Sequence, residues 1–348
     1  MSVRLVILVC AALACVITSP PDAKAGLVYL SLDPPGSVAS QATAISGSNA
    51  VGYYSNGSIT QGFLFDGSTY TTISYPGAIS TNTRGISGSN IVGIYEDASG
   101  NFHGYLYNGV YSSIDVPGAT YTETTGVSGN NIIGNSQPGN GHYSGFILNG
   151  STFKTVYVPG SFNTIAYAVS GNNVAGTGIW AFLYNGSSYL TINPPGATCS
   201  AAVSVSGNNV VGFYKTGGTN FHGFLYNGSD FITLDVPGAT STQATGVYGN
   251  NVVGFFTDGT GTRSFLYDGS TYTTLDYPES TLTVATAIDG SNVVGYYLDA
   301  KGQTHGFEYQ SAAVPEPSSL TLLSIGAVGM IGYAWRRRYR NKPAAASS

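Results

Sequence analysis

The stretch PGATSTQATGVYGNNVVGFFTDGTGTRSFLYDGSTYTTLDYP, residues 237–278, decides the fold because the chain repeats it from end to end. The copies align on a Pro-Gly step, and successive steps lie 41, 41, 42, 36, 42 and 41 residues apart. Repeats of about 40 to 50 residues are typical of propeller blades. The aligned residues are Gly36, Gly77, Gly118, Gly160, Gly196, Gly238 and Glu279, where glutamate replaces glycine.

Each copy contains four short runs with the character of strands, and turn residues bound each run. In the quoted copy, Asp268-Gly269 joins the last two runs and is a strong hairpin signal. The proline after the fourth run is tolerated at the outer edge of a sheet. No part of the body has a helical period, so we expect an all-β protein. The four runs are Ala244–Tyr248, Asn251–Phe256, Ser264–Tyr267 and Tyr272–Asp276.

Two positions of the repeat indicate close packing. The sixteenth residue after the aligned glycine is always glycine, as in Gly254, and a glycine inside a strand marks a bulge or a close backbone approach. The eighth residue is always small, which suits an innermost strand where neighbouring blades converge. Aromatic residues of the third run, such as Phe265, are expected to form the core between sheets. The small residues are Ala44, Gly85, Gly126, Ala168, Ser204, Gly246 and Ala287.

The last copy is incomplete, because it ends after three strands at Phe307-Glu308-Tyr309. The stretch 29–35 at the other end of the chain matches the fourth strand of the quoted copy, Tyr272–Pro278. We therefore predict that residues 26–311 form a seven-bladed β-propeller of ~41-residue, four-stranded repeats, with the last blade closed by the N-terminal strand. The first to seventh repeats are 37–77, 78–118, 119–160, 161–196, 197–238, 239–279, and 280–309 plus 27–36.

Charge excludes one class of partner. Charged residues make up only 8% of the chain, and residues 26–313 carry fifteen acids and five bases, a net charge of 5 − 15 = −10. A nucleic-acid-binding protein needs a basic surface, so we expect no nucleic-acid partner. Cys199 is the single cysteine of this body, which allows no internal disulfide.

The N-terminal segment has the pattern of a signal peptide. Arg4 precedes the apolar run 5–17, and Ala23-Lys24-Ala25 has the small residues that signal peptidase recognises. We expect signal peptidase to remove residues 1–25, so that the mature chain begins at Gly26.

The C-terminal segment reads as a membrane anchor. A linker, 312–319, contains Pro315-Glu316-Pro317 and precedes an apolar stretch, 320–335, that we predict to be a transmembrane helix. A basic tail, 336–348, follows and should stay cytoplasmic. The arginines expected to stop transfer are Arg336, Arg337, Arg338 and Arg340.

This order of triplet, short apolar helix and arginines resembles the PEP-CTERM sorting domain of Gram-negative bacteria that make exopolysaccharide. The resemblance implies recognition at Pro315, Glu316 and Pro317 by an exosortase, transient inner-membrane anchoring, and delivery to the cell surface or its matrix. The body resembles the extracellular repeats named for a His-Ala-Phe motif, here His103-Gly104-Tyr105, His222-Gly223-Phe224 and His305-Gly306-Phe307. That resemblance implies export and a repeat fold, with no defined activity.

Three equivalent histidines are candidate ligand residues, because histidine can bind metal or act as an acid or base. They are His103, His222 and His305, and they fall on different repeats without the close spacing of a metal site. Loop packing is the alternative interpretation. The fourth strands carry Asp33, Asp115, Asp235 and Asp276 at one equivalent place, which suggests a repeated turn cap or acid chemistry.

Loops between the second and third strands vary most and share one face with the links between repeats, so this face is the expected site of function. Asp97, Asp258 and Asp299 in these loops are candidate calcium ligands, with solvated turns as the alternative. The fourth repeat has a shortened loop beside Trp180, which is a candidate for stacking on a sugar or for filling the space left by the deletion.

No nucleophile–base motif or cofactor signature is present, so we predict no catalytic residue, no cofactor and no enzymatic activity. The expected function is a binding or structural role associated with exopolysaccharide. The alternatives are a polysaccharide lyase or hydrolase on a propeller scaffold and an inert spacer in the matrix.

Overall fold

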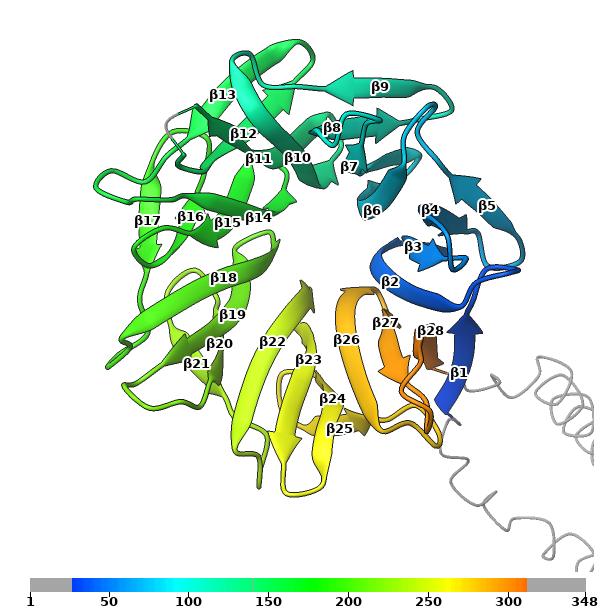
Figure 1. Cartoon of the computed structure of the whole chain (residues 1–348). Helices are drawn as coiled ribbons and strands as arrows, with labels where there is room; N and C mark the ends of the chain where they lie inside the picture. The colour runs from blue at the N-terminus through cyan, green and yellow to red at the C-terminus, as the bar shows by residue number, and fades with distance from the viewer. Residues whose placement is uncertain (1–26, 140, 312–348) are drawn as a thin grey trace, which may run out of the picture. The chain divides into compact units, whose positions relative to one another are not determined.

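The computed structural model describes residues 27–139 and 141–311, and residues Tyr29–Gln310 form one compact unit. All secondary structure in the described residues is β-strand, which confirms the all-β prediction. Five sheets have four antiparallel strands each, and a sixth sheet has eight. Figure 1 shows the sheets of this unit set side by side around a common centre, with the first strand of each repeat innermost.

The first five repeats form one four-stranded sheet each, with the strands in chain order. The strands of the first three are β2 (Ala39–Ser46), β3 (Asn49–Ser55), β4 (Thr60–Phe65), β5 (Tyr70–Ile73); β6 (Ser80–Ser87), β7 (Asn90–Glu96), β8 (Phe102–Tyr107), β9 (Tyr111–Ile114); and β10 (Ala119–Ser128), β11 (Asn131–Pro138), β12 (Ser144–Asn149), β13 (Thr152–Val156). Those of the next two are β14 (Ile165–Ser170), β15 (Asn173–Thr177), β16 (Ala181–Tyr184), β17 (Tyr189–Ile192); and β18 (Cys199–Ser206), β19 (Asn209–Lys215), β20 (His222–Tyr226), β21 (Phe231–Leu234).

The eight-stranded sheet combines the last two repeats, which a single parallel bridge between Thr262 and Leu282 joins. The N-terminal strand is the outer neighbour of β28, the last strand of the described chain (Figure 1). The strands are β22 (Ser241–Tyr248), β23 (Asn251–Asp258), β24 (Gly261–Tyr267), β25 (Tyr272–Leu275), β26 (Leu282–Asp289), β27 (Asn292–Leu298), β28 (Thr304–Ser311) and β1 (Leu27–Leu32).

The core lies between neighbouring sheets, as the aromatic third strands predicted. One aromatic residue of that strand, at the same position in each repeat, is at most 2% exposed in all seven. In the quoted repeat, Phe265 packs with Leu225 and Val211 of the repeat before it. The other residues at this position are Phe63, Tyr105, Phe146, Phe182, Phe224 and Phe307.

Glycine is required inside the second strand by backbone crowding, as predicted. A Cβ built on Gly254 would overlap the carbonyl oxygen of Gln243 and lie 2.8 Å from the Ala244 Cα. The facing strand has a register shift between Ala244 and Gly246, which brings its backbone against the glycine. The small eighth residues meet across neighbouring repeats, because a Cβ on Gly246 would lie 3.2 Å from the Ala287 Cα.

Turns at the end of the first strand connect one repeat to the next. The Asn209 side chain donates a 2.6 Å hydrogen bond to the carbonyl of Gly249 in the following repeat. The same contact joins the seventh repeat to the first, where Asn292 Nδ2 donates to the Gly47 carbonyl at 3.2 Å. Thr286 Oγ1 also donates to the Ala42 carbonyl at 2.9 Å.

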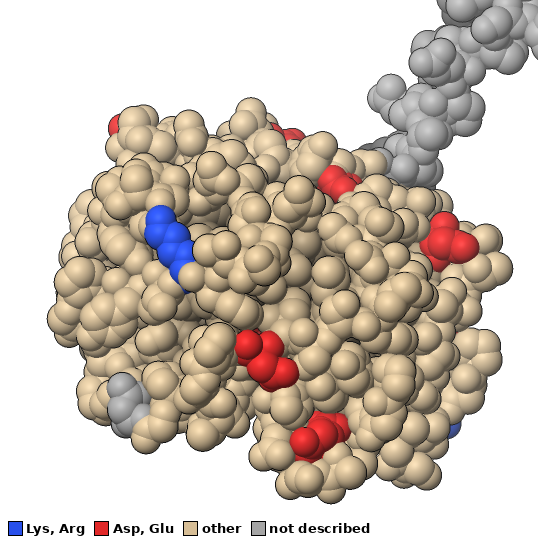
Figure 2. Space-filling view, turned by 90° about the horizontal axis from the view of Figure 1, so that it is seen from above, with Lys and Arg blue, Asp and Glu red and all other residues tan. Residues whose placement is uncertain are grey.

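The surface carries few charges. The face shown in Figure 2 is mostly uncharged, and its charged side chains stand apart from one another. Among residues 27–139 and 141–311, no helix is long and apolar enough to span a membrane. The predicted signal peptide 1–25, linker 312–319, helix 320–335 and tail 336–348 lie outside the described residues, as do the Pro-Glu-Pro triplet and the four arginines.

One acid is buried in the last repeat where every other repeat has an aliphatic residue. Glu308 in β28 is 0% exposed, and its Oε1 accepts a 2.9 Å hydrogen bond from Gln310 Nε2. Its Oε2 has no hydrogen-bond partner among the described residues, and burial raises the pKa of this carboxyl. The equivalent residues are Leu64, Leu106, Ile147, Leu183, Leu225 and Leu266.

We expect Glu308→Leu to raise the melting temperature by several degrees at pH 8 and by less at pH 5. The folded protein holds the Glu308 proton more tightly than the unfolded chain, so its stability falls as pH rises through the folded-state pKa. Leucine removes this loss, which for a buried charge is on the order of 1–3 kcal/mol. Melting curves at both pH values test the prediction. Leu266→Glu, at the equivalent position of the sixth repeat, should have the opposite effect, and equal pH dependence in all three proteins would contradict it.

Candidate functional site

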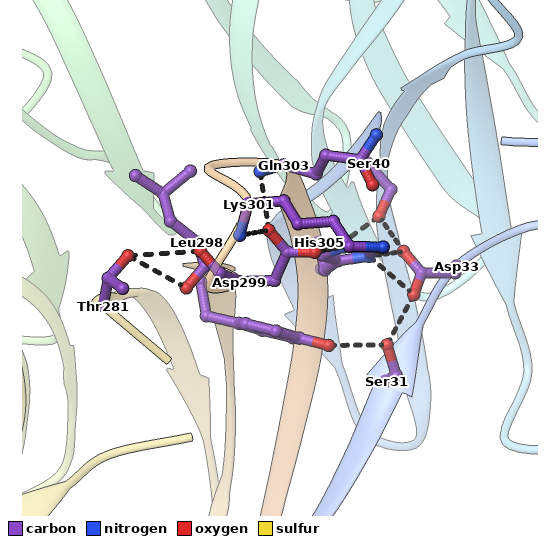
Figure 3. A network of polar contacts seen from close by, with 11 residues as sticks. Ser31, Asp33, Ser40, Thr281, Leu298, Asp299, Lys301, Gln303 and His305 are labelled. Carbon is purple, nitrogen blue, oxygen red and sulfur yellow. Dashed lines mark hydrogen bonds and ion pairs between the residues drawn. The ribbon is translucent and has the colours of Figure 1, made fainter. Parts of the chain in front are cut away.

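A histidine in the last repeat lies between two aspartates from distant parts of the chain (Figure 3). His305 Nδ1 is 3.0 Å from Asp33 Oδ2, and His305 Nε2 is 3.7 Å from Asp299 Oδ2. Asp33 directly follows β1, whereas Asp299 begins the turn between β27 and β28. The site is therefore complete only when the two ends of the described chain lie side by side.

Local hydrogen bonds fix both aspartates. Asp299 Oδ1 accepts bonds from the backbone N–H groups of Lys301 and Gln303, both at 2.8 Å. The bond from Gln303 is the largest of the effects that lower the pKa of Asp299. Ser40 Oγ donates to Asp33 Oδ1 at 2.6 Å and accepts from the Gly306 N–H at 2.7 Å (Figure 3). These bonds hold the carboxylates toward the imidazole.

The second repeat contains the same arrangement. His103 Nδ1 lies 2.7 Å from Asp115 Oδ1, and its Nε2 lies 3.3 Å from Asp97 Oδ2. Burial alone would lower the pKa of His103, but the hydrogen bonds and charges of Asp115 and Asp97 together raise it. The pKa of Asp97 is lowered to about 2, chiefly by the backbone N–H of Asn101. An ionised aspartate thus faces a histidine that favours its charged form.

Two further repeats carry variants of the site. In the sixth, Arg263 replaces histidine and contacts Asp258, while its Nη1 lies 3.9 Å from Asp276 Oδ2. The pKa of Asp258 is lowered to about 2, mainly by the Thr260 hydroxyl. In the fifth, His222 Nδ1 lies 2.9 Å from Asp235 Oδ2. Each pair has its imidazole or guanidinium near the start of the third strand and an aspartate just after the fourth.

Stacked tyrosines support the two histidine sites. The ring of Tyr297 stacks on His305 with 5.1 Å between centroids, and Tyr277 stacks on Tyr297 at 3.7 Å. In the second repeat the ring of Tyr95 lies 4.9 Å from His103, and Tyr75 lies 3.8 Å from Tyr95. One face of each imidazole is covered, so its polar edge is held in a single orientation.

Each calcium candidate has a positively charged or imidazole neighbour in the structure. Asp97 and Asp299 face histidines, and Asp258 faces Arg263. Among residues 27–139 and 141–311, no group of three or more metal-ligating side chains could hold an ion. Calcium binding at these loops remains untested. Trp180 occupies the histidine position of the fourth repeat and is partly exposed at the end of a tight turn, where its carbonyl accepts from the Gly178 N–H at 2.9 Å.

The sequence identified the histidines, the strand-end aspartates and the loop aspartates as three separate sets. The structure brings one member of each together in the second and seventh repeats. Cross-strand register could have predicted the pair, because Gly104 lies opposite Ile114 and places His103 beside Asp115. Arg263 takes the histidine position in the sixth repeat, and its role as the cation between two acids gave no signal in the sequence.

The solved structures that resemble the chain include a β-propeller domain. The β-propeller domain of the trilobed protease of Pyrococcus furiosus has a TM-score of 0.59 at 8% identity, over 80% of this chain and 100% of that one. A streptogramin B lyase structure gives 0.50 at 12% identity, over 82% and 98%. The acylaminoacyl peptidase of Pyrococcus horikoshii gives 0.56 at 8% identity, over 82% of this chain and 54% of that one. These likenesses establish a β-propeller-like fold.

The prediction that the protein is not an enzyme is wrong in its basis, because similar propellers occur in peptidases. Catalytic motifs in the sequence do not reveal this relationship of fold. At 8% identity these two peptidase matches concern the fold and assign no activity to the chain.

No curated protein matches the chain. The comparison that says most about function is the match to the C-terminal segment. The PEP-CTERM protein-sorting motif matches residues 313–338, as the sequence predicted. This motif implies export, membrane-anchored sorting and processing by an exosortase. The chain therefore combines a PEP-CTERM protein-sorting motif with an all-β, propeller-like body.

Proposed function

We propose that the protein is sorted to the bacterial surface or matrix, where one face of a seven-bladed ring binds exopolysaccharide. We define the loop face as the side that carries His103, His222, Arg263 and His305 with their aspartates. The same proposal includes an N-terminal signal peptide and a relationship of the body to the His-Ala-Phe repeats. The sorting motif at residues 313–338 supports the destination.

The observation that carries the binding role is the repetition of one polar site. Four repeats place a cationic or imidazole side chain beside an aspartate at the same position, and three of them add a second aspartate. Fixed imidazole and carboxylate edges provide donors and acceptors for sugar hydroxyls. Weak sites repeated on one rigid body suit a repetitive polymer, because linked contacts raise the overall affinity. The net charge of −10 in residues 26–313 favours a polymer without acidic groups.

Contacts between the seventh and first repeats support the ring of seven. Asp289 Oδ2 accepts a 2.6 Å hydrogen bond from the Gly47 N–H, and Asn292 donates to the Gly47 carbonyl. Elsewhere in the chain, Ser128 Oγ accepts in the same way from the Gly171 N–H at 3.0 Å. The same type of contact therefore occurs between consecutive repeats and between the last and the first.

We expect residues 26–313 to retain the host's exopolysaccharide, and His103→Ala with His305→Ala to weaken this retention at least tenfold. Both substitutions remove the central group of a complete site, while His142→Ala removes a histidine outside the repeated position and should have little effect. Co-sedimentation and the chain length of the polymer are measured together. Shortened chains would show cleavage in place of simple binding, and neither retention nor shortening would favour an inert spacer.

A further inference from the structure

A pocket of about 290 Å³ lies where the sixth repeat meets the seventh, on the loop face. The turn between β23 and β24 forms one wall, and the link from β25 to β26 forms the other. Its polar lining includes Thr262, Arg263, Asp276, Glu279, Ser280 and Thr281. The volume suits a ligand of about one or two sugar residues.

Glu279 lies in this wall with an unfavourable backbone conformation. It is the one non-glycine residue with positive φ, 61°, in the part of the chain that the structure describes. The other six repeats have glycine there, with φ between 74° and 84°. A left-handed conformation disfavours a residue with a Cβ by about 1 kcal/mol. Glycine would give a more stable fold than glutamate at this position, so we infer that the carboxylate is kept for a function.

The pocket also contains a donor and an acceptor that the protein leaves unmatched. Arg263 Nε and Asp276 Oδ1 are buried atoms with no hydrogen-bond partner among the described residues. Arg263 contacts Asp258 and lies 3.9 Å from Asp276, so this one cation is outnumbered by the carboxylates of Asp258, Asp276 and Glu279 and the region is negative. Burial is the main effect that raises the pKa of Asp276, and the neighbouring Asp258 adds to it.

We propose that this pocket binds an amino sugar with a free ammonium group. The ammonium would lie against the carboxylates of Asp276 and Glu279. It would donate charge-assisted hydrogen bonds, which are stronger than bonds between neutral groups. A ring hydroxyl can donate to a carboxylate of this pocket and accept from a neighbouring hydroxyl, because a hydroxyl does both. The side chains of Thr262, Ser280 and Thr281 offer further hydroxyl partners. This site goes beyond the binding of exopolysaccharide at the His–Asp pairs and does not depend on it.

The test compares β-1,4-linked glucosamine trimer with its fully N-acetylated form by calorimetry on the full-length protein. We expect the free amine to bind at least tenfold more tightly at pH 6. Glu279→Gly should weaken binding at least tenfold and also raise the melting temperature, because glycine relieves the strained backbone. A variant that becomes more stable yet binds less cannot be explained by misfolding.

Asp276→Asn should weaken binding in the same way, whereas Asp230→Asn makes the same charge change outside the pocket and should leave affinity unchanged. His103→Ala with His305→Ala should also leave it unchanged, which separates this pocket from the two complete histidine sites of the loop face. Equal binding of the acetylated trimer, or full affinity in Glu279→Gly, would overturn the proposal. So would displacement of the amine by millimolar calcium alone, which would make the pocket a cation site.

Discussion

Deleting residues 27–36 is expected to lower the melting temperature of the body by 10 °C or more. The deletion removes β1, which pairs with β28, together with Leu32, which is 0% exposed in the core between the last and first repeats. Burial of one leucine contributes about 1.5–3 kcal/mol, and the lost strand hydrogen bonds add to this. The measurement compares thermal unfolding of residues 26–313 and 37–313. An unchanged melting temperature would contradict the closed ring.

A synthetic peptide of residues 27–36 provides the control for this deletion. If the loss reflects the empty strand position, adding the peptide to residues 37–313 should restore most of the melting temperature in a concentration-dependent way. A peptide in which Leu32 is replaced by aspartate should restore little, because it would place a charge in the apolar core. Equal rescue by both peptides would show that the strand acts without specific packing.

Gly254→Ala is the second change for which we expect a large loss, on the order of 3 kcal/mol or more. The added Cβ would overlap the Gln243 carbonyl, so β22 or β23 must shift within a packed sheet. We expect the melting temperature to fall by roughly 5–10 °C. Gly259→Ala is the matched control, because a Cβ there meets nothing within 4 Å. Similar melting curves for the two variants would refute the role of backbone crowding.

The sequence predicted much of the fold because the signals are local and repeated. The hairpin at Asp268-Gly269 and the strand glycine Gly254 act within one sheet, and their meaning does not depend on distant residues. The pairing of β1 with β28 was accessible because residues 29–35 match a complete copy of the fourth strand. Contacts between repeats, such as Asn209 with Gly249, were not accessible because a turn asparagine has the same local pattern whichever neighbour it bonds.

The site was predicted only in its parts. His305 and Asp299 were identified, yet their approach to Asp33 depends on a contact across 272 residues. The pocket beside Arg263 gave no pattern in sequence, because its lining joins a loop of one repeat to a link between repeats. Glu279 was visible as an exception to glycine, but its positive φ required the structure.

The position of β1 also affects the order in which the body can fold. Synthesis runs from the N-terminus, so β1 emerges first and its partner β28 follows only after nearly the whole body. Such a distant pairing forms late, since a long chain must be ordered before the contact gains stability. Until then β1 remains open to pairing with other strands. The protein can complete its fold only when the last described strand has arrived, immediately before the sorting motif at residues 313–338.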